Sequence, residues 1–144
     1  MILVDSNLLL RLADQASPHR PVARQAILQL NRQNERLAVV PQNLYEFWVV
    51  ATRPAGKPNG LGMSPERVNL WLDYIQRRFL LLADAHAILP AWRELISTYK
   101  VTGYRAHDAR FVAAMKVHHI TRLLTFNAQD FQQYPITIID PSTM

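Results

Sequence analysis

The chain has 144 residues, of which 49% are hydrophobic and 19% are charged, a balance that supports one domain with a packed core and excludes wholesale disorder. It has no cysteine, which excludes disulfides, thiolate nucleophiles and Cys-ligated zinc. Its net charge of +5 favours polyanionic partners such as nucleic acid but is equally typical of a solubilising surface.

Five short apolar runs predict buried β-strands along the chain. They cover Ile2 to Val4, Leu37 to Val40, Phe79 to Ala83, Arg122 to Phe126 and Ile136 to Ile139. These runs do not alternate with polar residues, which is typical of a sheet covered by helices on both faces. We therefore expect an α/β fold with a mainly parallel central sheet, in a single domain over residues 1–144.

Segments between the strands show helical periodicity. The first clear stripe follows Ser64, a predicted N-cap, and Pro65 at the first helical position, and contains Val68, Trp71, Leu72 and Ile75. A second stripe contains Ile88, Trp92, Leu95 and Tyr99. Between these helices and the preceding apolar segment, residues 53–63 hold three of the four glycines, which predicts a loop. This loop is either a plain link between helices or a mobile flap that offers Arg53 and Lys57 to phosphates.

The first residues lack a basic leader, and no uncharged apolar stretch approaches the length of a membrane span. We therefore expect a cytoplasmic protein with no membrane partner.

Polar residues stand where strands end or helices begin, and they define the candidate site. Asp5 closes the first strand and Asn127 follows the fourth. The carboxyl ends of parallel strands meet at one sheet edge, where ligands bind in such folds. Together with Ser6 and Asn7, Asp5 offers oxygen ligands to a cation, although either Asp5 or Asn7 could instead cap the next helix.

Glu46 interrupts the apolar run from Leu44 to Val50. A buried carboxylate is costly unless it is paired or binds a metal, so Glu46 should have a partner. The alternatives are a position on the solvent face of a helix or an ion pair with a residue such as Arg53.

Asp108 opens a second helix-like segment, where it could act as a metal ligand, as a helix cap, or as both. Arg110 lies close enough in sequence to contact this acid or a substrate phosphate. Thr125 lies near the end of the predicted fourth strand, and Asn127 and Asp130 follow that strand; Asn127 or Asp130 could be an Asx-turn or cap residue. Asn127 adds no negative charge, which Asp130 could restore.

Other side chains carry weaker signals. The five histidines include no zinc-like spacing. Trp71 and Trp92 fall on helical stripes and are predicted to pack in the core. Tyr45 and Tyr104 lie near the acidic positions, so they are the better residues for stacking on a base, although core or subunit contacts are equally consistent with them.

Taken together, Asp5-Ser6-Asn7, Glu46, His107-Asp108-Ala109 and Thr125-x-Asn127-x-x-Asp130-Phe131 resemble the PIN-domain ribonucleases of the VapC-like toxin family. Each motif is short, and their order and spacing over nearly the whole chain carry the resemblance. The resemblance implies a three-layer α/β/α sandwich and a metal-dependent endoribonuclease that cleaves single-stranded or loop RNA.

The same resemblance implies roles for individual residues and partners. Asp5, Glu46 and Asp108 match the three core acids that bind Mg²⁺ or Mn²⁺, and Asn127 matches the fourth catalytic position, which is often Asp. Ser6, Asn7, Arg110, Thr125 and Asp130 become expected substrate contacts. A cognate antitoxin and a homodimer are the implied protein partners.

Two rival functions remain open from the sequence. Because Asn127 replaces an acid, the fold could serve as a weakened binding module for nucleic acid or protein. A phosphate-handling hydrolase with a nucleophilic Asp5 is disfavoured because no second Asp lies two residues later.

Overall fold

The computed structural model describes all 144 residues and contains one sheet of five parallel strands. Their order across the sheet is β3-β2-β1-β4-β5, so the first strand of the chain lies at the centre. The strands are β1 (Ile2–Val4), β2 (Leu37–Val39), β3 (Leu80–Leu81), β4 (Arg122–Leu124) and β5 (Thr137–Ile139). Leu3 of β1 pairs with Ala38 of β2 on one side and with Leu123 of β4 on the other.

Six α-helices and two short 3₁₀ helices connect or follow these strands. They are α1 (Ser6–Ala13), α2 (Arg20–Arg32), α3 (Pro41–Thr52), α4 (Pro65–Arg78), α5 (Ile88–Thr98), α6 (Arg105–Val117), η1 (Ala128–Asp130) and η2 (Pro141–Thr143). None of the helices has the length and apolar character needed to cross a membrane.

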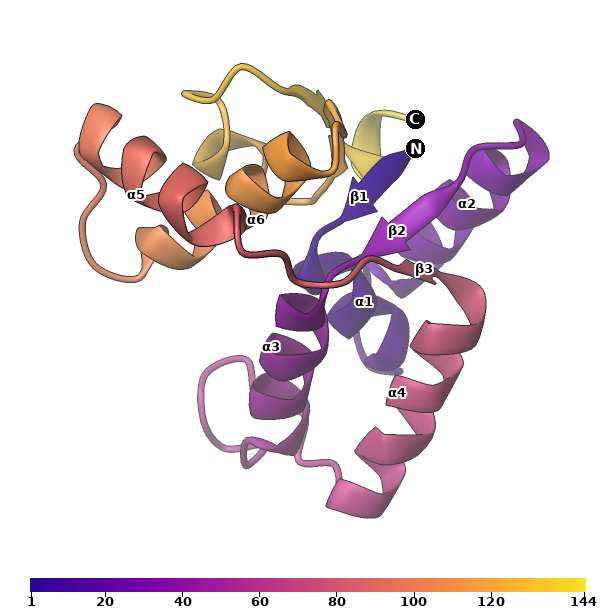
Figure 1. Cartoon of the computed structure of the whole chain (residues 1–144). Coiled ribbons are helices and arrows are strands. Elements are labelled where there is room, and N and C mark those ends of the chain that lie inside the picture. The colour runs from indigo at the N-terminus through magenta and orange to yellow at the C-terminus, as the bar shows by residue number, and fades with distance from the viewer.

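The two faces of the sheet bury separate hydrophobic cores. Ile2 and Val4 of β1 pack in the core beneath α1 to α4, whereas Leu3 points into the core beneath α5 and α6. Figure 1 shows these two groups of helices on opposite sides of the strands. Side chains alternate between the faces of a strand, so a strand covered on both sides must be apolar throughout. The predicted α/β/α sandwich is confirmed.

The start of α4 also follows the sequence prediction. The Ser64 side chain accepts a hydrogen bond of 3.2 Å from the backbone amide of Arg67, and Pro65 occupies the first helical position. Val68 and Ile75 on the predicted stripe are buried in the core.

Three local predictions were wrong. The predicted buried strand from Phe79 to Ala83 is reduced to Leu80–Leu81, whose side chains are 36% and 37% exposed because β3 lies at a sheet edge. At the opposite edge, β5 is also only partly buried. Finally, Asp108 does not open its helix: α6 begins at Arg105, and Asp108 lies within the first turn.

Candidate functional site

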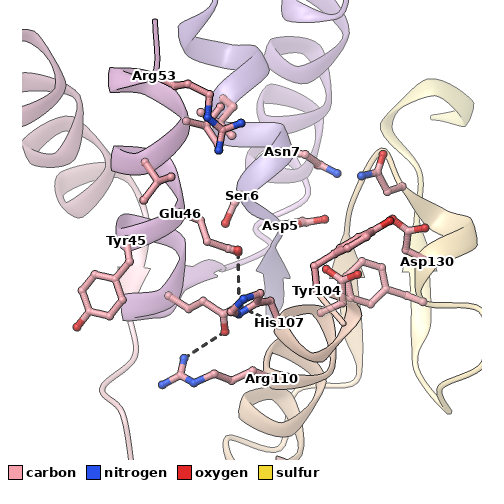
Figure 2. Close-up of a pocket in the computed structure, with 17 residues that line it drawn as sticks. Asp5, Ser6, Asn7, Tyr45, Glu46, Arg53, Tyr104, His107, Arg110 and Asp130 are labelled. Carbon is pink, nitrogen blue, oxygen red and sulfur yellow. Dashed lines mark hydrogen bonds between the residues drawn. The ribbon is translucent and has the colours of Figure 1, made fainter. Parts of the chain in front are cut away.

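A cavity of about 850 Å³ lies beyond the carboxyl ends of the central strands. The four predicted catalytic residues, Asp5, Glu46, Asp108 and Asn127, all line it. Four of the five expected substrate contacts line it as well, namely Ser6, Asn7, Arg110 and Asp130. Figure 2 shows Glu46 projecting from α3 on one side, Tyr104 and Asp130 on the other, and Asp5 between them. The structure therefore brings together residues that are up to 125 positions apart in the sequence.

The strand order explains this convergence. Asp5 directly follows β1, and its backbone amide donates a hydrogen bond of 2.9 Å to the carbonyl of Leu124 at the end of β4. Asn127 lies three residues beyond that carbonyl. Glu46 comes from α3, which follows β2 on the other side of β1, while Asp108 reaches the cavity from α6.

Asp5 is nearly buried, with 8% of its surface exposed. It occupies the N-cap position of α1, but its side chain makes no capping hydrogen bond. Instead, the hydroxyl of Thr125 donates a hydrogen bond of 2.7 Å to Oδ2 of Asp5. Burial raises the pKa of Asp5, while the hydrogen bond from Thr125 opposes that rise. The carboxylate is thus held by Thr125, the residue that follows β4.

Thr125 does not line the cavity, because its side chain is fully buried behind Asp5. Its hydroxyl oxygen also accepts hydrogen bonds from the Asn127 backbone amide at 3.0 Å and from Nδ2 of Asn7 at 3.2 Å. In this position Thr125 orients three predicted site residues. The contacts of Thr125 favour a positioning role, and its expected contact with substrate stays a prediction.

Glu46 is half-buried and has no basic partner within ion-pair distance. Its closest polar contact is Gln42, whose Nε2 donates to Oε1 of Glu46 at 3.4 Å. Arg53 donates instead to the carbonyl of Pro58 at 3.1 Å, so the alternative ion pair is not formed. Burial, followed by the charge of Asp5, raises the pKa of Glu46 to about 7.

Asp108 is affected in the same way. Burial raises its pKa to about 6, with further contributions from the charges of Asp5 and Asp130. The carboxylates of Asp5, Glu46 and Asp108 therefore face one cavity without a protein cation paired to any of them.

Asp130 supplies a fourth acid to the cavity. It ends the short helix η1, and its carboxylate forms an ion pair with the guanidinium of Arg105. Its charge raises the pKa of both Asp5 and Asp108, although burial is the larger cause at each residue. Asn127, by contrast, is exposed and uncharged. Asp130 therefore adds a negative charge on the side of the cavity where Asn127 lies, and that charge is paired with Arg105.

Arg110 contacts neither Asp108 nor any other core acid. Its Nη2 donates to Asp84 and its Nη1 to Oε1 of Gln42, both at 3.1 Å. Gln42 in turn donates to the carbonyl of His107 at 2.8 Å as well as to Glu46, and Figure 2 draws the resulting chain of hydrogen bonds. Arg110 and Gln42 thereby link α3 to α6 across the site.

Two buried amides that sequence reasoning missed hold the framework together. Gln42 is 5% exposed and Asn43 is fully buried. Nδ2 of Asn43 donates to the carbonyl of Val4 at 2.8 Å and to Oγ of Ser6 at 3.2 Å, while its Oδ1 accepts from the Val40 amide. Two adjacent amides in the first turn of an otherwise apolar helix were the available signal, since buried amides need partners.

The donor set fits a hard divalent cation in charge and chemistry. Carboxylate and amide oxygens are the ligands that Mg²⁺ and Mn²⁺ prefer, and crowded acids are stabilised by a cation. As the side chains are placed, however, no group of three or more acidic or histidine residues is close enough to hold a metal. Binding of one ion by all three carboxylates would therefore require them to move closer together, whereas Mg²⁺ commonly uses one or two carboxylates and completes its shell with water.

Comparison with known proteins agrees with this architecture. A model of the PIN domain family matches residues 2–136. A toxin-antitoxin complex from Klebsiella pneumoniae has a chain of similar fold, with a TM-score of 0.69 and 21% identity over 98% of both chains. VapBC-1 from nontypeable Haemophilus influenzae gives a TM-score of 0.70 and 17% identity over 99% of both chains.

VapC20 from Mycobacterium tuberculosis, a toxin that cleaves the sarcin-ricin loop, gives a TM-score of 0.66 and 15% identity over 95% of this chain and 99% of its own. No curated protein sequence matches the chain. The family match spans nearly the whole sequence and coincides with an acid-lined cavity on an α/β/α sandwich. The chain therefore belongs to the PIN domain family.

Proposed function

We propose that this protein is a metal-dependent endoribonuclease that hydrolyses phosphodiester bonds in single-stranded or loop RNA. The observation that carries the proposal is the set of three acids, Asp5, Glu46 and Asp108, which line one cavity without a protein cation paired to them. Asp5 and Asp108 would hold Mg²⁺ or Mn²⁺ directly. Glu46 would bind the same ion or activate water, and Asn127 would position water.

A bound divalent cation supplies charge neutralisation of the phosphodiester and lowers the pKa of a coordinated water. Residues of the chain orient the carboxylates that would hold this cation. The hydroxyl of Thr125 donates to one oxygen of Asp5, and Nε2 of Gln42 donates to Glu46. Burial raises the pKa of Glu46 to about 7 in the metal-free cavity, and a bound cation would lower that pKa and favour the carboxylate form.

Three features support RNA as the substrate. The chain carries a net charge of +5, which attracts a polyanion. Tyr45 and Tyr104 line the cavity with 64% and 74% of their surfaces exposed, so both rings are available for stacking on unpaired bases. VapC20, which shares the fold, is a toxin that cleaves the sarcin-ricin loop.

We further propose that the protein is the toxin of a toxin-antitoxin pair, with a cognate antitoxin as its partner. Solved relatives of the same fold support this, because they include toxin-antitoxin complexes from Klebsiella pneumoniae and Haemophilus influenzae. A homodimer stays a prediction; size-exclusion chromatography with light scattering at micromolar concentration would test it.

The cleavage test uses the purified protein, a labelled structured RNA and either Mg²⁺ or Mn²⁺. We expect cleavage that EDTA abolishes and that Asp5→Asn and Asp108→Asn each reduce by at least about 100-fold. Asp73→Asn is the matched control, because Asp73 lies exposed on α4 and makes no hydrogen bond or ion pair. Absence of cleavage with both metals would refute the proposal.

The alternative is a PIN-like binding module for nucleic acid or protein with a weakened metal site. Two observations favour it: Asn127 is uncharged, and Asp130 is already paired with Arg105. This alternative predicts RNA binding without cleavage and an affinity that Asp108→Ala leaves unchanged. Gel shifts performed beside the cleavage assay distinguish the two functions.

A further inference from the structure

A second cavity of about 340 Å³ adjoins the acidic one. The two cavities share Asn7, Leu10, Val50 and Asn127, so they lie on either side of these residues. The second cavity is bounded by α1, the end of α3 and the loop of residues 53–63. Its size is at the lower end of ordinary small-ligand pockets.

Arg11 contributes a positively charged side chain to the second cavity. Its guanidinium lies over the ring of Phe126, 5.0 Å from the ring centroid. It forms no ion pair with a protein acid. Asp14, the one acid that lines the same cavity, accepts a hydrogen bond from the Ala16 amide at 3.0 Å. The guanidinium of Arg11 is therefore held over an aromatic ring, and no protein acid is paired with its positive charge.

The opposite wall is the part of the 53–63 loop that hydrogen-bonds to the end of α3. This loop folds back along α3 before it crosses to α4 (Figure 1). The Leu61 amide donates to the carbonyl of Val50 at 3.3 Å, and the Gly62 amide donates to that of Arg53 at 2.8 Å. These bonds fix Asn59, Gly60 and Leu61 where they line the cavity.

The lining chemistry matches a nucleotide. A stacked guanidinium can contact a phosphate or the face of a base. The side chains of Ser17, Asn59 and Asn127 offer hydroxyl and amide groups that can pair with base edges and ribose hydroxyls. Leu10 and Val50 supply apolar contact for a base. This cavity lies next to the cavity of the acids. Its composition therefore suits a second nucleotide of an RNA strand whose reacting phosphate lies at the acids.

We propose that this second cavity binds the nucleotide adjacent to the one held at the acids. Arg11 and Asn59 would contact this second nucleotide of an unpaired RNA segment. This inference rests on the proposed ribonuclease function. It predicts that an RNA strand crosses the site from the acids toward the 53–63 loop.

The test measures RNA binding, so that its outcome does not depend on catalysis. In an Asp5→Asn background, we would titrate a fluorescein-labelled pool of random-sequence RNA decamers and follow anisotropy. Arg11→Gln should weaken binding by roughly fivefold or more, since it removes a charge-assisted contact. Arg24→Gln, which removes an equal charge from an exposed position on α2, should change it less than twofold.

A second pair of variants isolates the amide of Asn59. Asn59 has a φ of 62°, which glycine adopts freely, so Asn59→Gly removes the amide without backbone strain. Asn34→Gly is its matched control, because Asn34 has a φ of 59° and lies exposed after α2. We expect Asn59→Gly to weaken decamer binding by about threefold and Asn34→Gly to leave it unchanged.

The inference is overturned if Arg11→Gln and Arg24→Gln weaken binding equally, or if neither Arg11→Gln nor Asn59→Gly has an effect. Cleavage of RNA by the protein without these substitutions separates the two proposals. If it cleaves RNA while the Arg11 and Asn59 variants bind normally, the ribonuclease function stands and the second cavity is not a subsite. If it does not cleave RNA, the ribonuclease function fails whatever the binding assay gives.

Discussion

The hydroxyl of Thr125 donates a hydrogen bond of 2.7 Å to Asp5, a residue 120 positions earlier in the chain. This contact joins the ends of β1 and β4 and orients the most buried acid of the site. Because the same hydroxyl accepts from Asn7 and from the Asn127 amide, its loss would remove one buried and two partly buried hydrogen bonds.

Thr125→Val should therefore lower the free energy of unfolding by about 1 to 3 kcal/mol, since valine keeps the shape of threonine but cannot hydrogen-bond. Urea denaturation provides the measurement. Thr137→Val, at an exposed position on β5, is the control and should change stability by less than about 0.5 kcal/mol. Equal effects of the two substitutions would show that Thr125 has no special role.

The acidic site should make stability depend on pH. Burial and neighbouring carboxylates raise the pKa of Glu46 from 4.5 to about 7 and that of Asp108 from 3.8 to about 6. Between about pH 4.5 and 7 the folded chain therefore binds more protons than the unfolded chain, so the free energy of unfolding should fall as pH rises. Glu46 alone accounts for up to about 3 kcal/mol of that fall.

Urea denaturation across this pH range measures the effect. Glu46→Gln should flatten the dependence, because the glutamine has no proton to lose, whereas Glu66→Gln, at an exposed position on α4, should not. At about pH 8, added Mg²⁺ should recover stability if it binds the folded acids. A stability that rises between pH 4.5 and 7 would contradict the assigned pKa directions.

Asp130 should matter more to RNA cleavage than its place outside the three core acids suggests. Its charge acts on Asp5 and Asp108, so Asp130→Asn should reduce the cleavage rate at least about tenfold. The rate would be measured at saturating Mn²⁺ and again at limiting Mn²⁺. Arg105→Gln breaks the same ion pair but keeps the acid, so it should retain most of the activity. Equal losses in the two variants would assign the effect to the ion pair instead.

Gly60 should be intolerant of a side chain. A Cβ at this position would lie 2.2 Å from the carbonyl oxygen of Pro54 and 2.8 Å from that of Arg53, and neither backbone oxygen can move aside cheaply. Gly60→Ala should thus lower the free energy of unfolding by roughly 1 to 3 kcal/mol. At Gly56 a Cβ meets nothing within 4 Å, so Gly56→Ala should be nearly neutral in the same urea titration.

The sequence predicted the sheet, its parallel sense and the convergence of the acids because these depend on local patterns. Apolar runs mark strands, and polar residues at their carboxyl ends meet at one edge. The order of the strands across the sheet, by contrast, produces no local pattern in the sequence. The apolar pattern predicted that Leu80 and Leu81 are buried, yet they are partly exposed because they lie in an edge strand with a neighbouring strand on one side only.

Partners between distant segments were also beyond the sequence patterns. Arg110 was expected near Asp108, two residues away, but it pairs with Asp84 from the segment after β3. Asn127 directly follows the predicted strand from Arg122 to Phe126, whereas Asp130 is brought to the cavity by the short helix η1. Both outcomes depend on packing between elements, which periodicity does not encode.

The central place of β1 has a consequence for synthesis of the protein. β1 is made first, yet its neighbour β4 ends at residue 124, and the cavity also needs Asp108 and Asp130. A chain still emerging from the ribosome therefore lacks half of the site until most of it has been translated. The full set of proposed catalytic and neighbouring acids therefore exists only after residue 130 has been translated.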